Sequence, residues 1–187
     1  MKDFTPKAWL LPQPVVIIGT YNADGEPNAM NAAWCGQWDM KEIMISMGAH
    51  ATTQNLNRCP EFTVTFATES TLVAADYVGI VSANKVPDKM RATGWKHQKA
   101  KNVNAPVFLD FPMTLECRIV DKLQESETGC YIIAEILNIV CDENYLAADG
   151  KPDVEKMKLI TFDPVHNGYI VLGKRVGNAF ADGKKLK

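Results

Sequence analysis

The stretch NAMNAAWCGQW, residues 28–38, carries the most informative pattern in the chain. It follows an apolar segment at residues 15–18 and the turn sequence NADG at residues 22–25, so we predict that it is the return strand of a β-hairpin. Its far end loses the alternation of a plain strand, because small residues are mixed with amides, a thiol and two indoles. Such a surface lets backbone N–H and C=O groups reach a flat ligand. The alternative is a hairpin strand packed under a helix.

Outward from this hairpin the pattern is rich in strands with short helices between them. We predict strands at residues 42–47, 61–67, 111–121, 130–141 and 169–172, helices at 54–58, 72–81, 87–91 and 153–158, a loop at 95–106 and a polar connection at 122–129. This order predicts a mainly β fold, an antiparallel Greek-key barrel with short helices, as one domain over residues 1–187. A Rossmann fold is disfavoured, because no GxGxxG follows the first strand.

Composition restricts the class of protein. The net charge of −2 gives no electrostatic case for nucleic acid, and no apolar run reaches membrane-spanning length. Charges and prolines in the first 14 residues argue against a signal peptide. Five cysteines without a CxxC pair and three scattered histidines disfavour disulfides and metal sites. We therefore expect a cytoplasmic protein with no nucleic-acid or membrane partner and no bound metal.

A polar cluster lies where a buried strand gives way to a helix. Its members are Ser46, His50, Thr52, Thr53 and Asn55. Free N–H groups at a helix N-terminus, with nearby hydroxyls and a partly protonated histidine, suit a phosphate group. In the alternative interpretation, Thr52 or Thr53 only caps its own helix and His50 faces solvent.

Two further groups are candidates for a ligand site. The first follows the helix at 72–81 and consists of Ser82, Asn84, Lys85 and Lys89. A lysine there would stabilise negative charge on a cofactor, although an ordinary surface loop is the alternative. The second consists of Tyr169 and Phe180, which lie among glycines and would cover a flat ligand or close one end of the barrel.

Taken in order, five segments resemble the flavin reductase-like, FMN-binding split-barrel family, and its flavoredoxin branch most. They are PVVIIGT (14–20), NAMNAAWCGQW (28–38), ISMGAHATTQNLNR (45–58), ADYVGIVSANK (75–85) and GYIVLGKRVGNAF (168–180). The resemblance spans residues 12–180. It implies a noncovalently bound FMN cofactor and a homodimer.

The resemblance also implies a role for each matching position. Residues that line the flavin ring are Asn31, Ala32, Ala33, Trp34 and Cys35. Residues that hold the ribityl chain and phosphate are Ser46, Met47, His50, Thr52, Thr53 and Asn55. Ser82 and Lys85 match a loop that approaches the flavin, and Tyr169 and Phe180 match aromatic positions near its open face. Two positions depart from the family pattern: His50 replaces a frequent arginine or lysine, and Cys35 a frequent serine or threonine, which favours a packing role for its thiol.

Three functions follow from this resemblance. The chain is expected to be an FMN-dependent oxidoreductase that transfers electrons through its flavin, as flavoredoxins do with redox protein partners. The alternatives are an NAD(P)H-dependent flavin reductase and a non-enzymatic flavin-binding barrel. No catalytic acid or base is assigned, because flavin reduction needs none and no histidine–carboxylate pair stands out.

Overall fold

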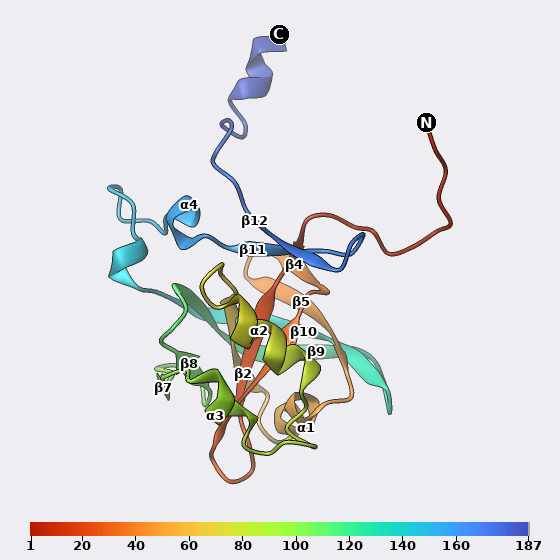
Figure 1. Ribbon diagram of the computed structural model, residues 1–187. Coiled ribbons are helices and arrows are strands. Elements are labelled where there is room, and N and C mark those ends of the chain that lie inside the picture. The colour runs from red at the N-terminus through yellow and green to blue at the C-terminus, as the bar shows by residue number, and fades with distance from the viewer. Residues whose placement is uncertain (187) are drawn as a thin grey trace.

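The computed structural model describes residues 1–186 and is built on a seven-stranded antiparallel sheet, with strand order β3-β2-β6-β9-β10-β5-β4 (Figure 1). The strands are β2 (Val16–Tyr21), β3 (Pro27–Ala32), β4 (Cys35–Asp39), β5 (Glu42–Gly48), β6 (Glu61–Phe66), β9 (Met113–Ser126) and β10 (Gly129–Cys141). The predicted hairpin is confirmed, with Val16 opposite Ala32 and Tyr21 opposite Pro27. Its return strand is shorter than the predicted stretch 28–38, because it ends at Ala32 and the chain then forms β4, which pairs with β5 at the other edge of the sheet.

Smaller elements cover this sheet. A three-stranded sheet joins β1 (Gln13–Pro14), β11 (Ile160–Asp163) and β12 (Gly168–Val171), and a two-stranded ladder joins β7 (His97–Lys99) and β8 (Pro106–Phe108). The helices are α1 (Ala51–Arg58), α2 (Leu72–Ile80), α3 (Lys89–Thr93) and α4 (Val154–Met157), with 3-10 turns η1 (Glu143–Tyr145) and η2 (Asp182–Leu186). Among residues 1–186, no helix is both long and apolar enough to span a bilayer.

The mainly β, antiparallel barrel predicted from the sequence is confirmed, and it is split, as the family resemblance implied. β3 and β4 form the two edges of the main sheet, so its hydrogen-bonded ladder does not close. The β9–β10 hairpin lies in the middle of the sheet, where it joins β6 to β5. The break in the ladder between β3 and the β4–β5 pair is the structural feature from which the candidate site is built.

The two faces of β2 pack into two separate hydrophobic clusters. Val16 and Ile18 face the barrel interior with Phe62 and Ile132, whereas Ile17 faces outward into a second cluster under α2. Residues on both faces of β2 are buried, so its sequence is continuously apolar rather than alternating.

Two segments that were predicted to be irregular form strands in the structure. Residues 95–106, predicted as a loop, contain β7, whose three exposed polar residues carry no strand signal and pair with β8. The polar connection predicted at 122–129 is instead the distal part of β9 and β10, which continue to Ser126 and from Gly129. Both errors arise because pairing with a neighbouring strand overrides local polarity.

Candidate functional site

The segment that joins β3 to β4 forms one end of a slot in the split barrel. Ala33 and Trp34 carry the chain from the edge strand β3 across to β5, where the Trp34 carbonyl accepts a hydrogen bond from the Ser46 N–H at 2.8 Å. Because β3 pairs only with β2, its other backbone edge faces this slot. An edge strand presents N–H and C=O groups to whatever lies beside it.

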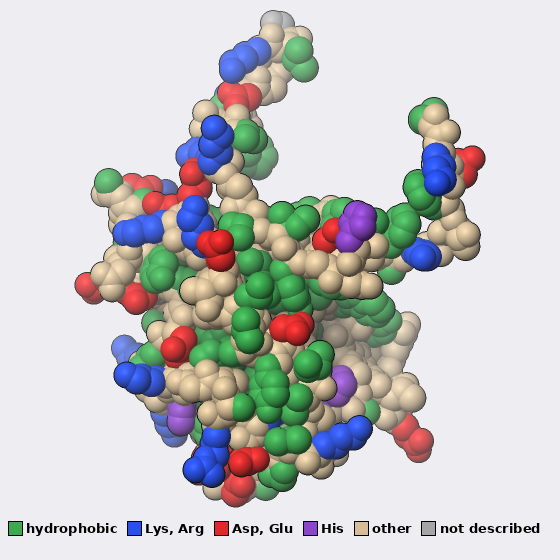
Figure 2. All heavy atoms as spheres, in the orientation of Figure 1, with side chains coloured by type: hydrophobic (Ala, Val, Ile, Leu, Met, Phe, Trp, Pro, Cys, Tyr) green, Lys and Arg blue, Asp and Glu red, His purple; other side chains and the backbone are tan. Residues whose placement is uncertain are grey.

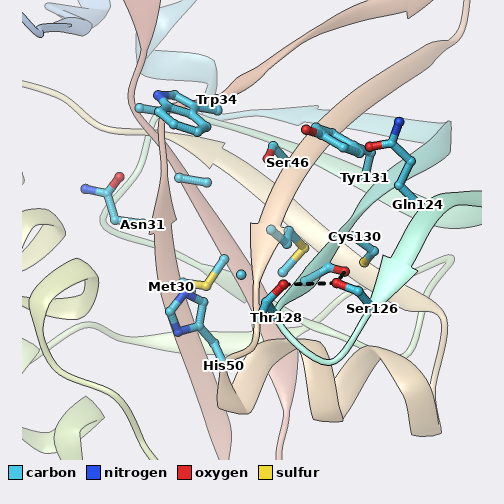
Figure 3. A pocket seen from close by; sticks show the side chains of 15 residues that line it. Met30, Asn31, Trp34, Ser46, His50, Gln124, Ser126, Thr128, Cys130 and Tyr131 are labelled. Carbon is cyan, nitrogen blue, oxygen red and sulfur yellow. Dashed lines mark hydrogen bonds between the residues drawn. The ribbon is translucent and has the colours of Figure 1, made fainter. Parts of the chain in front are cut away.

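The slot holds a cavity of about 580 Å³, shown in Figure 3. Its walls are β3, the Ala33–Trp34 crossing, the end of β5 and the start of α1, and the tip of the β9–β10 hairpin forms its rim. The lining residues are Met30, Asn31, Ala32, Ala33, Trp34, Ser46, Met47, Gly48, His50, Gln124, Ser126, Thr128, Gly129, Cys130 and Tyr131. This volume lies within the range typical of cofactor pockets.

Seven of the predicted site residues meet at this cavity although they come from two separate segments. Asn31, Ala32, Ala33 and Trp34 line one side, and Ser46, Met47 and His50 line the other. In Figure 3 the Trp34 indole lies across one end of the cavity and His50 lies at the other. The side chain of Asn31 points away from the cavity, because its Nδ2 donates to the Ala75 carbonyl of α2 at 3.0 Å.

The residues that form the rim of this cavity were not predicted from the sequence. Six residues of the β9–β10 hairpin line the cavity: Gln124, Ser126, Thr128, Gly129, Cys130 and Tyr131. Their segment looked like a polar connection, and only the register of β10 against β5, with Gly129 opposite Gly48, brings it to the cavity. The signal available in the sequence was the glycine at position 129. In the structure Gly129 has φ +151° and lies against the backbone of Met47.

The start of α1 differs from the prediction. Its N-cap is His50 rather than Thr52 or Thr53. The Thr53 hydroxyl donates to the Gly48 carbonyl at 2.6 Å and accepts from the His50 N–H at 3.3 Å. Thr52 is buried and its hydroxyl accepts from Asn28 Nδ2 at 2.9 Å. Both hydroxyls therefore bond inside the fold, and the first turn of α1 offers mainly backbone N–H groups to a ligand.

Asn55 is buried on the inner side of α1 and lines neither the main cavity nor the side cavity. Its Nδ2 donates to Thr20 Oγ1 and to Asn22 Oδ1, both at 2.9 Å, while its Oδ1 accepts from Arg58. The structure thus uses this amide to attach α1 to the β2–β3 hairpin. Its predicted role with a phosphate group stays a prediction.

A side cavity of about 130 Å³ adjoins the main one, and both share Met30, Asn31 and His50. Ser82 and Lys89 line it together with the start of α1, whereas Lys85 is exposed on the loop after α2. Lys89 is only 3% exposed, and its Nζ donates to the carbonyls of Val78 at 3.2 Å and Val81 at 2.7 Å. Burial lowers the pKa of Lys89 to about 8. An ammonium group with three N–H bonds has one left for a ligand.

A third cavity of about 250 Å³ lies between α2 and β12, on the outer side of Asn31 and Ala33. Tyr169 lines it, and its hydroxyl donates to Asp76 Oδ1 at 2.7 Å. Burial and the Asp76 carboxylate raise the pKa of Tyr169 to about 12. Phe180 does not join these residues: it lies on the arm after β12, which projects from the body, and it is 97% exposed (Figure 1).

Cys35 lies just outside the slot. It lines an apolar groove of about 450 Å³ beside residues 8–14, and this groove shares Ala33, Trp34, Ser46 and Tyr131 with the main cavity. Burial raises the pKa of the Cys35 thiol to about 11, so the thiol is protonated at neutral pH and is a poor nucleophile. This supports the packing role that the sequence favoured for it.

Comparison with known proteins agrees with this architecture. Residues 9–154 match the family model described as flavin reductase like domain. The match covers most of the chain, and the chain belongs to this family. A search of curated protein sequences found no significant match.

Two solved flavoredoxins are similar to the chain over its whole length. Flavoredoxin of Desulfovibrio vulgaris (Miyazaki F) is 30% identical, with a TM-score of 0.91 over 98% of this chain and 99% of its own. Flavoredoxin from Methanosarcina acetivorans is 27% identical, with a TM-score of 0.88 over the whole of both chains. A 2-nitrobenzoate 2-nitroreductase from Pseudomonas fluorescens shares the fold at 16% identity, with a TM-score of 0.80 over 92% of this chain and 87% of its own.

Proposed function

We propose that the protein is a flavoprotein that binds FMN noncovalently in the slot of its split barrel and transfers electrons through it. The observation that carries this proposal is the cavity of about 580 Å³, bounded by a free strand edge, small residues and a helix N-terminus, in a chain of the flavin reductase like domain family. When bound, FMN supplies the redox chemistry, and the protein binds and orients it.

The ring end of FMN is assigned to the segment 31–34. Ala32 and Ala33 leave room for a flat ring, and the free edge of β3 offers backbone hydrogen bonds to the polar atoms of a flavin. The Trp34 indole, which is 62% exposed, provides an aromatic face at the end of the slot. Ser46 and Met47 on β5 form the opposite wall.

The phosphate end is assigned to the start of α1. The eight-residue helix directs free N–H groups and the positive end of its dipole toward the side cavity, which Ala51 and Thr52 line. His50 at the N-cap and Lys89 across the cavity add cationic or hydrogen-bonding groups. We therefore propose Lys89, rather than the exposed Lys85, as the lysine that faces the phosphate.

Lys89→Met tests this assignment. Loss of a charge-assisted hydrogen bond is expected to weaken FMN binding by roughly 1.5–3 kcal/mol. In the unmodified protein the pKa of free Lys89 is about 8, so affinity is expected to fall as pH rises above that value and Lys89 loses its charge. The phosphate attracts the charged form, so FMN is expected to raise this pKa. Fluorescence titration of FMN from pH 6 to pH 10 measures both effects.

Lys85→Met is the matched control. It removes an exposed lysine from the same region of the chain, and we expect little change in FMN affinity. If Lys85→Met carries the loss and Lys89→Met binds FMN normally at every pH, the phosphate contact belongs to Lys85.

The proposed activity is electron transfer with redox proteins, which the similarity to two flavoredoxins supports. Anaerobic titration of the FMN-loaded protein with dithionite, NADH and NADPH tests it. Bleaching of the flavin absorbance by dithionite but not by pyridine nucleotides fits an electron carrier. Rapid bleaching by NADH or NADPH would instead assign a flavin reductase, and failure to retain FMN would reject the flavoprotein proposal itself.

Two further properties belong to this proposal. We propose a homodimer, because large apolar side chains are exposed along and beside β4: Trp34, Trp38 and Met40 are 62%, 53% and 92% exposed. We also propose a cytoplasmic setting, which the free thiols of all five cysteines support.

A further inference from the structure

The apolar groove that Cys35 lines has a wall that the flavin proposal does not use. This wall is the chain between residues 8 and 14, where the N-terminal arm joins the body of the protein near β4 (Figure 1). Figure 2 shows hydrophobic side chains along this arm. The other walls include Cys35 and Gly36 of β4 and Met44 of β5, and the groove measures about 450 Å³. It is therefore large enough for a small organic molecule.

Among residues 1–186, no side chain of Asp, Glu, Lys, Arg or His lines this groove. Its walls are mostly aliphatic and aromatic side chains, and the Cys35 thiol is protonated at neutral pH because burial raises its pKa to about 11. An ion that entered the groove would lose its hydration without gaining a partner of opposite charge. The groove therefore favours a neutral, largely apolar molecule.

Gln13, which lines this groove, has a hydrogen-bonding atom that the fold does not use. It is 7% exposed, and its Oε1 is buried without a hydrogen-bond partner in the described part of the chain. Its backbone is held in β1, where it pairs with Phe162 and its carbonyl accepts the Thr161 hydroxyl at 2.7 Å. An unpaired acceptor inside a protein costs free energy. A ligand that donates a hydrogen bond to Oε1 would remove this cost.

The groove also adjoins the proposed flavin site. It shares Ala33, Trp34, Ser46 and Tyr131 with the main cavity. In Figure 3 the side chains of Trp34, Ser46 and Tyr131 lie toward the end of that cavity opposite His50, which is the end assigned to the flavin ring. The exposed Trp34 indole offers a face on which a flat molecule can stack.

We propose that this groove binds a neutral aromatic molecule that carries a hydroxyl group, with the hydroxyl donating to Gln13 Oε1 and the ring lying between the arm and Trp34. Such a molecule matches the uncharged walls, the aromatic face and the unpaired acceptor. This gives the protein a small-molecule site in addition to the redox proteins proposed above as partners. That the bound molecule lies beside the FMN ring rests on the proposed function; binding in the groove does not.

The probe 2-naphthol tests the chemical class, because it is flat, hydroxylated and neutral at pH 7. Equilibrium dialysis against the FMN-loaded protein is expected to show one molecule bound per chain. The analogue 2-methoxynaphthalene has no O–H donor and is expected to bind about tenfold more weakly. The anion 2-naphthalenesulfonate is expected not to bind detectably. Equal affinity for all three would mean non-specific binding of aromatic rings only and would overturn the proposal.

Gln13→Met tests the assigned hydrogen bond. Methionine keeps the length of the side chain without the acceptor, so affinity for 2-naphthol is expected to fall about tenfold and affinity for 2-methoxynaphthalene to stay unchanged. The midpoint of thermal unfolding of the unliganded protein is expected not to fall, because Oε1 has no partner to lose. A lower midpoint with an unchanged preference for 2-naphthol would show that Gln13 is purely structural, against this proposal.

Two neighbouring leucines on the arm provide a matched pair of variants. Leu10 is 74% exposed and lines the groove, whereas Leu11 is 52% exposed and does not line it. Leu10→Asp places a carboxylate beside the apolar ligand and is expected to weaken 2-naphthol binding about fivefold or more. Leu11→Asp is expected to bind the probe normally. If Leu10→Asp has no effect, or both variants have the same effect, the probe binds elsewhere and the proposal fails.

FMN separates this proposal from the flavin proposal. Because FMN fills the slot and not the groove, 2-naphthol is expected to bind the loaded and the FMN-free protein alike and to change the flavin absorbance spectrum when FMN is present. Competition between FMN and 2-naphthol would place the probe in the slot and overturn the groove site. A protein that binds 2-naphthol through Gln13 but never retains FMN would keep the groove site and reject the proposed function. A protein that retains FMN but does not bind 2-naphthol would do the reverse.

Discussion

Gly129→Ala is expected to destabilise the β9–β10 hairpin and to abolish most FMN binding. A Cβ atom at this position would lie 2.2 Å from the Met47 carbonyl oxygen and 3.0 Å from Gly48 Cα, and both neighbours are backbone atoms that cannot rotate away. The glycine also has φ +151°, a conformation that L residues rarely adopt and that costs ~1–3 kcal/mol in strain. The hairpin tip must therefore move away from β5, and it carries the rim of the main cavity with it.

Urea denaturation and FMN titration measure the two effects separately. We expect a loss of at least ~2 kcal/mol in the free energy of unfolding, with weaker FMN binding even below the unfolding transition. Gly168→Ala is the matched control, since a Cβ there meets nothing within 4 Å and the backbone is not in the left-handed region. A Gly129→Ala protein with unchanged stability and FMN affinity would show that the rim does not depend on this close approach.

Glu116→Gln is expected to destabilise the fold at a position away from the site. Glu116 is 1% exposed in β9, and its carboxylate accepts the backbone N–H groups of Lys101 and Asn102 at 3.1 and 3.0 Å and the Asn102 amide at 2.6 Å. Glutamine replaces one acceptor oxygen by an NH₂ group that faces these donors. Oε2 accepts both Asn102 donors and Oε1 only the Lys101 N–H, so the amide can leave a single buried donor without a partner, and we expect a loss of about 1–3 kcal/mol in the free energy of unfolding.

The measurement is again the free energy of unfolding from urea denaturation. Glu143→Gln, at an exposed position in η1, is the control and is expected to change it by less than about 0.5 kcal/mol. Because Glu116 lines none of the cavities described here, the folded variant is expected to bind FMN normally. A Glu116→Gln protein as stable as the unmodified chain would mean that the loop at 101–102 finds other acceptors.

Much of the fold could be predicted because its signals are local. The apolar run at 15–18 and the NADG turn predicted the β2–β3 hairpin, and alternating residues predicted β6. Strands with polar sequences were missed, since β7 and the distal part of β9 form by pairing with β8 and β10. A polar strand has no hydrophobic period to reveal it.

The residues of the candidate site were likewise predicted where the signal is local and missed where it depends on strand pairing. Residues in the two continuous segments at 31–34 and 46–50 were predicted, and they meet at one cavity. The hairpin rim was missed because Gln124 and Tyr131 reach the cavity only through the register of β10 against β5. The resemblance selected Lys85 as the site lysine, whereas in the structure it is Lys89 that is buried beneath the end of α2.

By itself the sequence determined the class of fold, the family and the two segments that form the walls of the slot, because each depends on residue types and short spacings. The tertiary structure decided where the barrel splits, which hydroxyls bond inside the fold and which lysine is buried. The physical reason is that burial, register and strand edges are properties of pairs of segments distant in sequence, and no local pattern of residues encodes them.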